Sequence, residues 1–190
     1  RPSGQAKVSS VPGRRRSVDL SGIKGRLAEA LVESMFRRAL YRMTRFGRES
    51  DLRGILRVGR DEDFVPDFLA LKGDLARRDA PGVYQTFMIE VKYRADLDRY
   101  LGLQQRGGED SALAKSKAKW PNLYVIFVTD RPGEGRSCFQ ALDVRSYAPG
   151  EPVKTQPLYE IAALEIYPNN VIEHEELARQ LFGLLSSFSP

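Results

Sequence analysis

Cysteine and histidine are nearly absent from this chain of 190 residues, which has one of each, Cys138 and His174. A single cysteine can form neither a disulfide framework nor a thiolate zinc cluster, and it suits a reducing compartment. A single imidazole cannot organise a histidine-rich metal site. It also disfavours serine or cysteine hydrolase chemistry, because His174 lies in the glutamate-rich start of an expected terminal helix.

Long apolar segments are missing as well. No run approaches the roughly 20 residues of a membrane span, and the first twenty residues lack the apolar stretch of a secretory signal. No glycine-rich phosphate loop follows a strand, which disfavours an unrelated α/β protein that binds small phosphorylated ligands. We therefore expect a soluble, cytoplasmic protein without a membrane partner, and the missing initiator Met suggests a trimmed or partial chain.

Positive charge is concentrated in the first third of the chain. Residues 1–60 contain 15 Lys and Arg against 5 Asp and Glu, whereas residues 61–190 contain 15 against 20. A basic segment suits a polyanion, so we expect DNA as the partner and a nucleoid location when bound, although a solvated basic face has the same composition. The candidate phosphate-binding residues are Arg14, Arg15, Arg16, Arg37, Arg38, Arg42, Arg45 and Arg48.

Residues 1–20 are basic and rich in Gly, Pro and Ser, so we expect a flexible arm before a single domain over residues 21–190. Apolar residues at helical spacing predict an α-helix over residues 24–43. Glu29 falls inside its apolar face, where an uncompensated buried carboxylate would be costly. Glu29 is therefore either a functional acid or a first-turn acid that water still reaches.

The rest of the pattern predicts a mixed sheet and two further helices. The strands expected over residues 64–71 and 83–94 should form a hairpin. The nearly all-apolar run over residues 122–129 is typical of a strand covered on both faces. The expected class is α/β, with a central mixed sheet flanked by helices and an extra C-terminal helix. The segments are an extended piece around 41–49, strands over 64–71, 83–94, 122–129 and 137–144, helices over 111–120 and 169–188, and a looser stretch around 104–105.

The strand over 83–94 carries charges within its apolar middle. Side chains alternate faces along a strand, so Ile89 and Val91 point one way while Glu90 and Lys92 emerge together on the other, about 6–7 Å apart at the backbone. Asp67 is the only acid of the preceding strand, and it reaches the same place if the register allows. Carboxylates that converge beside an amine suit Mg²⁺ or Mn²⁺ and the hydrolysis of a phosphoryl group, in which Lys92 can orient or help to deprotonate a water.

These residues carry a resemblance to a known family. "PD" at 66–67 and "EVK" at 90–92 resemble the signature of the PD-(D/E)XK nuclease superfamily, which includes restriction endonuclease-like and Holliday-junction-resolvase-like enzymes. The segment "KGRLAEALVE" with Glu29 is similar to the helical glutamate of those resolvases, and the expected element order matches the αβββαβ core of the superfamily. The resemblance covers about residues 22–130.

The resemblance implies cleavage of DNA phosphodiester bonds with Mg²⁺ or Mn²⁺. It implies that Asp67, Glu90 and Glu29 are metal ligands and that Lys92 is the water-positioning base or an electrostatic aid. A polar residue is also implied on the helix after the second strand of the hairpin. Its candidates are Gln104, Gln105, Lys115 and Lys117.

We therefore expect a DNA endonuclease of a repair, recombination, restriction or mobile-element type. It would act as a homodimer or within a larger complex, because cutting both strands needs two active sites. The alternative is a non-catalytic DNA-binding or assembly protein on a nuclease scaffold, in which Glu90 and Lys92 form only a surface ion pair. The sequence has no zinc finger, evident helix-turn-helix or aromatic cluster of the kind that stacks single strands.

Overall fold

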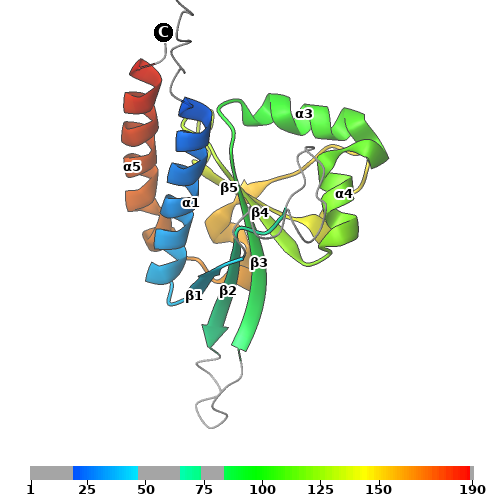
Figure 1. Cartoon of the computed structure of the whole chain (residues 1–190), viewed down its shortest axis with the longest axis horizontal. Helices are drawn as coiled ribbons and strands as arrows, with labels where there is room; N and C mark the ends of the chain where they lie inside the picture. Colours follow the sequence, from blue (N-terminus) through cyan, green and yellow to red (C-terminus); the bar gives the residue numbers. More distant parts are fainter. Residues whose placement is uncertain (1–18, 47–64, 74–83, 189–190) are drawn as a thin grey trace, which may run out of the picture.

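A six-stranded mixed sheet forms the centre of the computed structural model, which describes residues 19–46, 65–73 and 84–188 (Figure 1). The strands follow the order of the chain, and every neighbouring pair is antiparallel except β3 and β4. This architecture confirms the expected α/β class. The strands are β1 (Arg42–Arg45), β2 (Phe68–Gly73), β3 (Tyr84–Tyr93), β4 (Leu123–Val128), β5 (Phe139–Asp143) and β6 (Gln156–Pro157).

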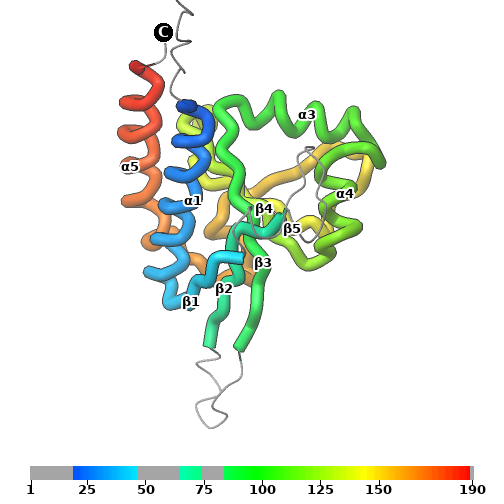
Figure 2. The backbone as a smooth tube through the Cα atoms, in the orientation of Figure 1, coloured from blue at the N-terminus to red at the C-terminus, as the bar shows by residue number. Residues whose placement is uncertain are grey.

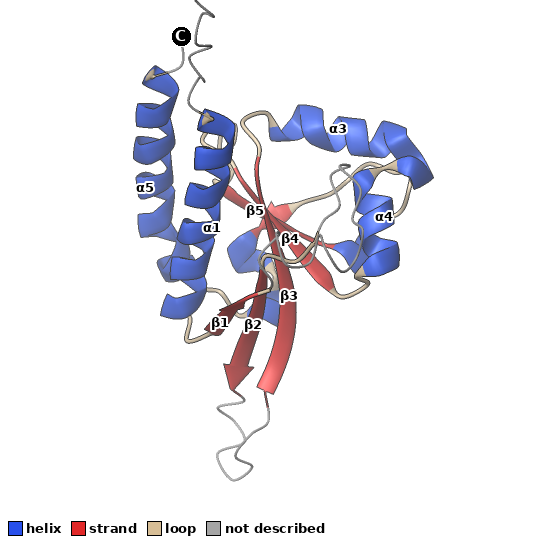
Figure 3. Cartoon of the chain, in the orientation of Figure 1, coloured by secondary structure: helices blue, strands red, loops and turns tan. Residues whose placement is uncertain are grey.

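Helices cover both faces of the sheet, with α1 and α5 on one face and α3 and α4 on the other (Figure 3). Helices α1 and α5 run antiparallel, so the start of α1 lies beside the end of α5 (Figure 2), where Lys24 Nζ donates to Ser186 Oγ over 2.8 Å. The helices are α1 (Leu20–Arg38), α3 (Leu97–Gly107), α4 (Ala112–Lys119) and α5 (Pro168–Ser187), and the 3-10 turns are η1 (Gly108–Asp110), η2 (Val144–Ser146), η3 (Leu158–Glu160) and η4 (Ala162–Leu164).

Strand β4 is buried along its whole length. Tyr124, Ile126 and Val128 join the core under α1 and α5, whereas the intervening residues join the core under α3 and α4. Because both faces are covered, nearly every position of this strand is apolar. The prediction of a strand covered on both faces is confirmed.

The first helix ends earlier than its apolar pattern predicts. Helix α1 stops at Arg38, and Leu40 has a left-handed backbone with φ of 65° and a 72% exposed side chain. The amide of Tyr41 then donates to the carbonyl of Phe36, which closes the helix and turns the chain into β1. Leu40 therefore does not belong to the buried face, while Met43 is buried as a residue of a strand rather than of the helix.

Other boundaries also differ from the expected ones. The stretch around residues 104–105, expected to be loose, lies inside helix α3. Helix α5 begins at Pro168, one residue before the expected start, and the Asn170 side chain accepts a hydrogen bond from the Tyr167 amide ahead of the helix. Among the helices that the structure describes, none is both long and apolar enough to cross a membrane.

Candidate active site

The middle of β3 separates apolar from charged side chains, as its alternation predicts. Ile89 and Val91 are buried in the core under α1 and α5. Met88, on the opposite face, packs with the core under α3 and α4. Since Glu90 and Lys92 alternate with Ile89 and Val91, they emerge on the α3 and α4 face of the sheet.

Asp67 directly precedes β2 and bonds to β3 through both its backbone and its side chain. The register sets Phe68 opposite Ile89, and the Asp67 amide donates to the Ile89 carbonyl over 2.8 Å. The next hydrogen bond along β3 goes to a side chain instead of the backbone. The Val91 amide donates to Asp67 Oδ2 over 2.7 Å. The strand pairing thus fixes the direction of the Asp67 side chain toward Glu90.

Glu90 is the most deeply buried acid of the site, with a side chain only 3% exposed. Its Oε1 lies 2.5 Å from Lys92 Nζ, which makes an ion pair within one strand. Its Oε2 is buried and has no hydrogen-bond partner among the described residues. A buried carboxylate oxygen without a partner is costly in a purely structural role, so it is a candidate ligand atom.

Burial disfavours the ionised form of both carboxyl groups, and at Glu90 the neighbouring Asp67 charge adds to this effect. Burial raises the pKa of Asp67 to about 6, against the opposing effect of the Val91 amide. Burial raises the pKa of Glu90 well above its ordinary range, and the Asp67 charge raises it further while Lys92 lowers it. The two groups interact electrostatically, so they titrate as a coupled pair that retains a proton near neutral pH.

Glu29 lies near this pair but does not join it. Its carboxylate accepts from Arg45 Nη1 over 2.9 Å, and its side chain is 22% exposed. The same arginine also bonds to Glu33 over 3.2 Å and stacks over the Phe68 ring. The charge of Glu29 still contributes to the raised pKa of Asp67, so the two acids are neighbours, with Glu29 held by Arg45.

The donor set fits a hard divalent cation through two carboxylates. In the part of the chain that the structure describes, no group of three or more His, Cys, Asp or Glu side chains could hold a metal ion. Mg²⁺, however, is commonly bound through one or two carboxylates, with waters and substrate phosphate oxygens as the other ligands. Asp67 and Glu90 meet that requirement, and the unpartnered Glu90 Oε2 is available.

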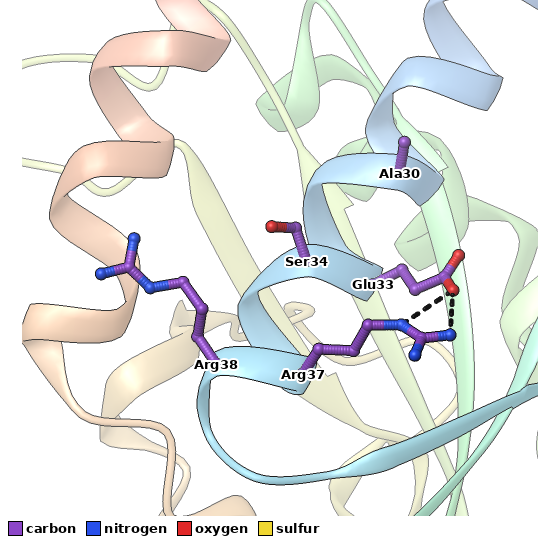
Figure 4. Close-up of a pocket in the computed structure, with 5 residues that line it drawn as sticks. All are labelled: Ala30, Glu33, Ser34, Arg37 and Arg38. Atoms are coloured by element: carbon purple, nitrogen blue, oxygen red, sulfur yellow. Dashed lines mark hydrogen bonds and ion pairs between the residues drawn. The ribbon is translucent and has the colours of Figure 1, made fainter.

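The described arginine candidates lie on α1 and β1, and three of them already bond to acids. An open hollow of about 470 Å³ on α1 includes Arg37 and Arg38 (Figure 4). Arg37 Nη2 lies 2.8 Å from Glu33 Oε1, Arg38 pairs with Glu173 on α5, and Arg45 pairs as described above. Arg42 is exposed. Arg14, Arg15, Arg16 and Arg48 lie outside the described residues.

These exposed ion pairs contribute little to stability, about 0–1 kcal/mol each in general. A phosphate that binds one of the arginines would therefore replace a carboxylate partner at small cost. The positions remain compatible with binding of a polyanion, although the pairing was not visible in the sequence.

The accessory candidates on α3 and α4 differ in their surroundings. Gln104 is buried, and its Oε1 accepts from the Leu113 amide over 3.1 Å, which joins α3 to the first turn of α4. Gln105 is partly buried and Lys115 is exposed. Lys117 donates to the carbonyls of Arg145 and Tyr147 over 3.1 and 2.7 Å. Gln104 and Lys117 are thus engaged in holding the helices in place.

No family model matches this chain, and no match was found among curated proteins or solved structures.

Proposed function

We propose that this chain is a divalent-metal-dependent deoxyribonuclease that hydrolyses phosphodiester bonds. The observation that carries the proposal is the convergence of Asp67 and Glu90, from neighbouring strands, beside Lys92, with one Glu90 oxygen buried and unpartnered among the described residues. The order α1, β1, β2, β3, then the helices α3 and α4, then β4 supports a restriction-endonuclease-like αβββαβ core with two helices before the last strand. This arrangement also supports membership of the PD-(D/E)XK superfamily.

In this proposal Asp67 and Glu90 would hold Mg²⁺ or Mn²⁺, which when bound would supply Lewis-acid activation of a water and charge neutralisation at the phosphoryl group. The Val91 amide keeps Asp67 Oδ2 in place, and Glu90 contributes its buried Oε2. Lys92 Nζ, 2.5 Å from the other Glu90 oxygen, donates a hydrogen bond to the attacking water or to a phosphate oxygen.

The coupled acids also make metal binding dependent on pH. Because both pKa values are raised, metal binding must displace the proton that the pair retains. Metal affinity should therefore rise as the pH passes upward through about 6, the raised pKa of Asp67. Glu29 becomes available to the site only if Arg45 exchanges it for another anion, such as a phosphate of the DNA.

Cleavage assays on supercoiled plasmid and on a four-way junction test the proposal. The parent chain should nick or cut at least one substrate with Mg²⁺ or Mn²⁺ and none with EDTA. Lys92→Ala should lower the rate at least about 100-fold while DNA affinity stays the same, because positioned proton transfer and charge stabilisation contribute this much. Lys154→Ala, which removes an exposed lysine, is the matched control and should cleave normally.

A folded parent chain that cuts no DNA with either metal, and whose DNA affinity is unchanged by Asp67→Ala, would instead support a non-catalytic DNA-binding or assembly protein. If cleavage breaks both strands, two active sites are needed, and we propose a homodimer or a larger complex as the active form.

A further inference from the structure

Two aromatic side chains from distant parts of the chain meet beside the acid pair, so the fold forms an aromatic contact that the sequence alone did not indicate. Phe46 directly follows β1, and Trp120 directly follows α4. Their ring centroids are 5.7 Å apart with an interplanar angle of 85°, an edge-to-face arrangement. Both residues remain partly exposed, so part of this aromatic surface is open to a ligand.

Backbone contacts place this aromatic pair next to Asp67 and Glu90. The Phe46 amide donates to the Asp67 carbonyl over 2.8 Å. Trp120 packs against the same apolar cluster as Met88, which lies on the Glu90 side of β3. The chain then leads from Trp120 into β4, where Leu123 pairs with Met88. The aromatic pair therefore flanks the acids on the α3 and α4 face of the sheet.

The helix that leads to Trp120 carries only positive charge. Helix α4 has the sequence ALAKSKAK, with three lysines and no acid. Lys115 and Lys119 are exposed and four residues apart, so they share one helix face, whereas Lys117 anchors the helix to two backbone carbonyls. A basic helix that is followed directly by a partly exposed indole provides the two kinds of group used to hold single-stranded nucleic acid, positive charge and an aromatic ring.

We propose that Phe46, Trp120, Lys115 and Lys119 bind an unpaired DNA segment beside the acid pair, so that the preferred substrate contains single-stranded bases. The inference rests on the proposed function for the choice of DNA as ligand. Trp120 stacks on an unpaired base, and the two lysines bind flanking phosphates. Duplex DNA is a poorer ligand for this surface, because its bases are stacked on one another and expose only their edges in the grooves.

Intrinsic fluorescence tests the inference directly, because Trp120 is the only tryptophan of the chain. The full chain is titrated in EDTA with oligothymidylate and with a duplex of equal phosphate number. The single strand should quench the emission, and the duplex should quench it much less at the same saturation. Absence of quenching by saturating oligothymidylate, or equal quenching by the duplex, would overturn the inference.

Variants separate stacking from charge in binding measured by the anisotropy of a labelled oligothymidylate. Trp120→Ala should weaken binding about 10- to 100-fold, the effect of one lost base stack, and Trp120→Phe should largely retain it. If Trp120→Ala does not fold, Trp120→Leu keeps apolar packing without a ring and should weaken binding as well. Unchanged affinity in the folded Ala or Leu variant would refute stacking.

The double variant Lys115→Ala and Lys119→Ala should reduce the slope of log affinity against log salt by about 1.4, because each phosphate contact on a single strand contributes about 0.7. Lys154→Ala should leave the slope unchanged, and an unchanged slope in the double variant would refute the lysine contacts. All these measurements are made without metal. A chain that binds single strands in this way but cuts nothing would retain this inference and reject the nuclease.

Discussion

The acid pair should destabilise the metal-free chain at neutral pH, and Asp67→Asn should relieve this cost. The variant keeps the shape of the side chain, so its amide oxygen can still accept from the Val91 amide. The NH₂ group of the new asparagine can donate a hydrogen bond to the Glu90 carboxylate. The negative charge of Asp67, which raises the pKa of Glu90, is removed. The substitution therefore removes a charge while the hydrogen bonds are retained.

The magnitude follows from the pKa of Asp67, which burial raises to about 6 from an ordinary value of 3.8. A difference of about two pH units corresponds to about 3 kcal/mol that favours the protonated folded form. The folded chain retains this proton where the unfolded chain has lost it, so the contribution of Asp67 to the free energy of unfolding falls as the pH rises from about 4 to about 6, and then levels off. After about 1 kcal/mol is subtracted for the weaker neutral hydrogen bonds, Asp67→Asn should stabilise the chain by about 2 kcal/mol above pH 7.

Thermal unfolding in EDTA at about pH 8 and about pH 4 measures this effect. At the higher pH the melting temperature of Asp67→Asn should exceed that of the parent by about 4 to 8 °C, and the difference should vanish at the lower pH, where the parent pair is protonated. Asp98→Asn is the control, because the Asp98 side chain is 76% exposed. An equal change at both pH values, or a loss of stability at pH 8, would refute the electrostatic reasoning.

A comparison of the parent and Asp67→Asn also tests whether Mg²⁺ binds at Asp67. Saturating Mg²⁺ should raise the melting temperature of the parent, because a ligand that binds only the folded chain adds about 2.7 kcal/mol at a hundred times its dissociation constant. Asp67→Asn should lose most of that gain. A gain that is equal in both proteins would place the bound metal elsewhere.

Two further substitutions test structural roles. Leu40→Gly should stabilise the chain by up to about 1 kcal/mol in urea unfolding. Glycine adopts the positive φ of 65° without strain, and the leucine side chain that is lost is 72% exposed. A loss of stability would show that this turn is not strained. Gln104→Ala should destabilise the chain by about 1–2 kcal/mol, because the buried Leu113 amide loses its acceptor. Mg²⁺-dependent cleavage per folded molecule should stay the same. A selective loss of cleavage would assign Gln104 an accessory role.

The strongest sequence-based predictions were those that depend on periodicity. Alternation along residues 83–94 placed Glu90 and Lys92 on the face opposite Ile89 and Val91, and the buried cores confirm that separation. The apolar run over 122–129 was likewise predicted as a doubly covered strand. Periodicity succeeds here because a strand has a strict two-residue repeat and burial acts on every second side chain.

Helix ends and side-chain partners were harder to predict. The apolar pattern continued past residue 38, yet the left-handed Leu40 ends the helix, since the short loop must turn the chain into β1. Glu29 was recognised as an acid on an apolar face, but its partner Arg45 lies on the next strand and was expected to bind phosphate. Such pairings depend on how a helix and a strand cross, which periodicity does not encode.

By itself, the sequence determined the α/β class and the faces of β3, and it singled out the acids that we propose as metal ligands. Only the tertiary structure decided that Asp67 meets Glu90, that Glu29 is held by Arg45, and that Phe46 contacts Trp120 beside them. The physical reason is that local chain geometry assigns each side chain to a face, whereas strand register and helix packing, set by the burial of the whole core, assign its neighbours.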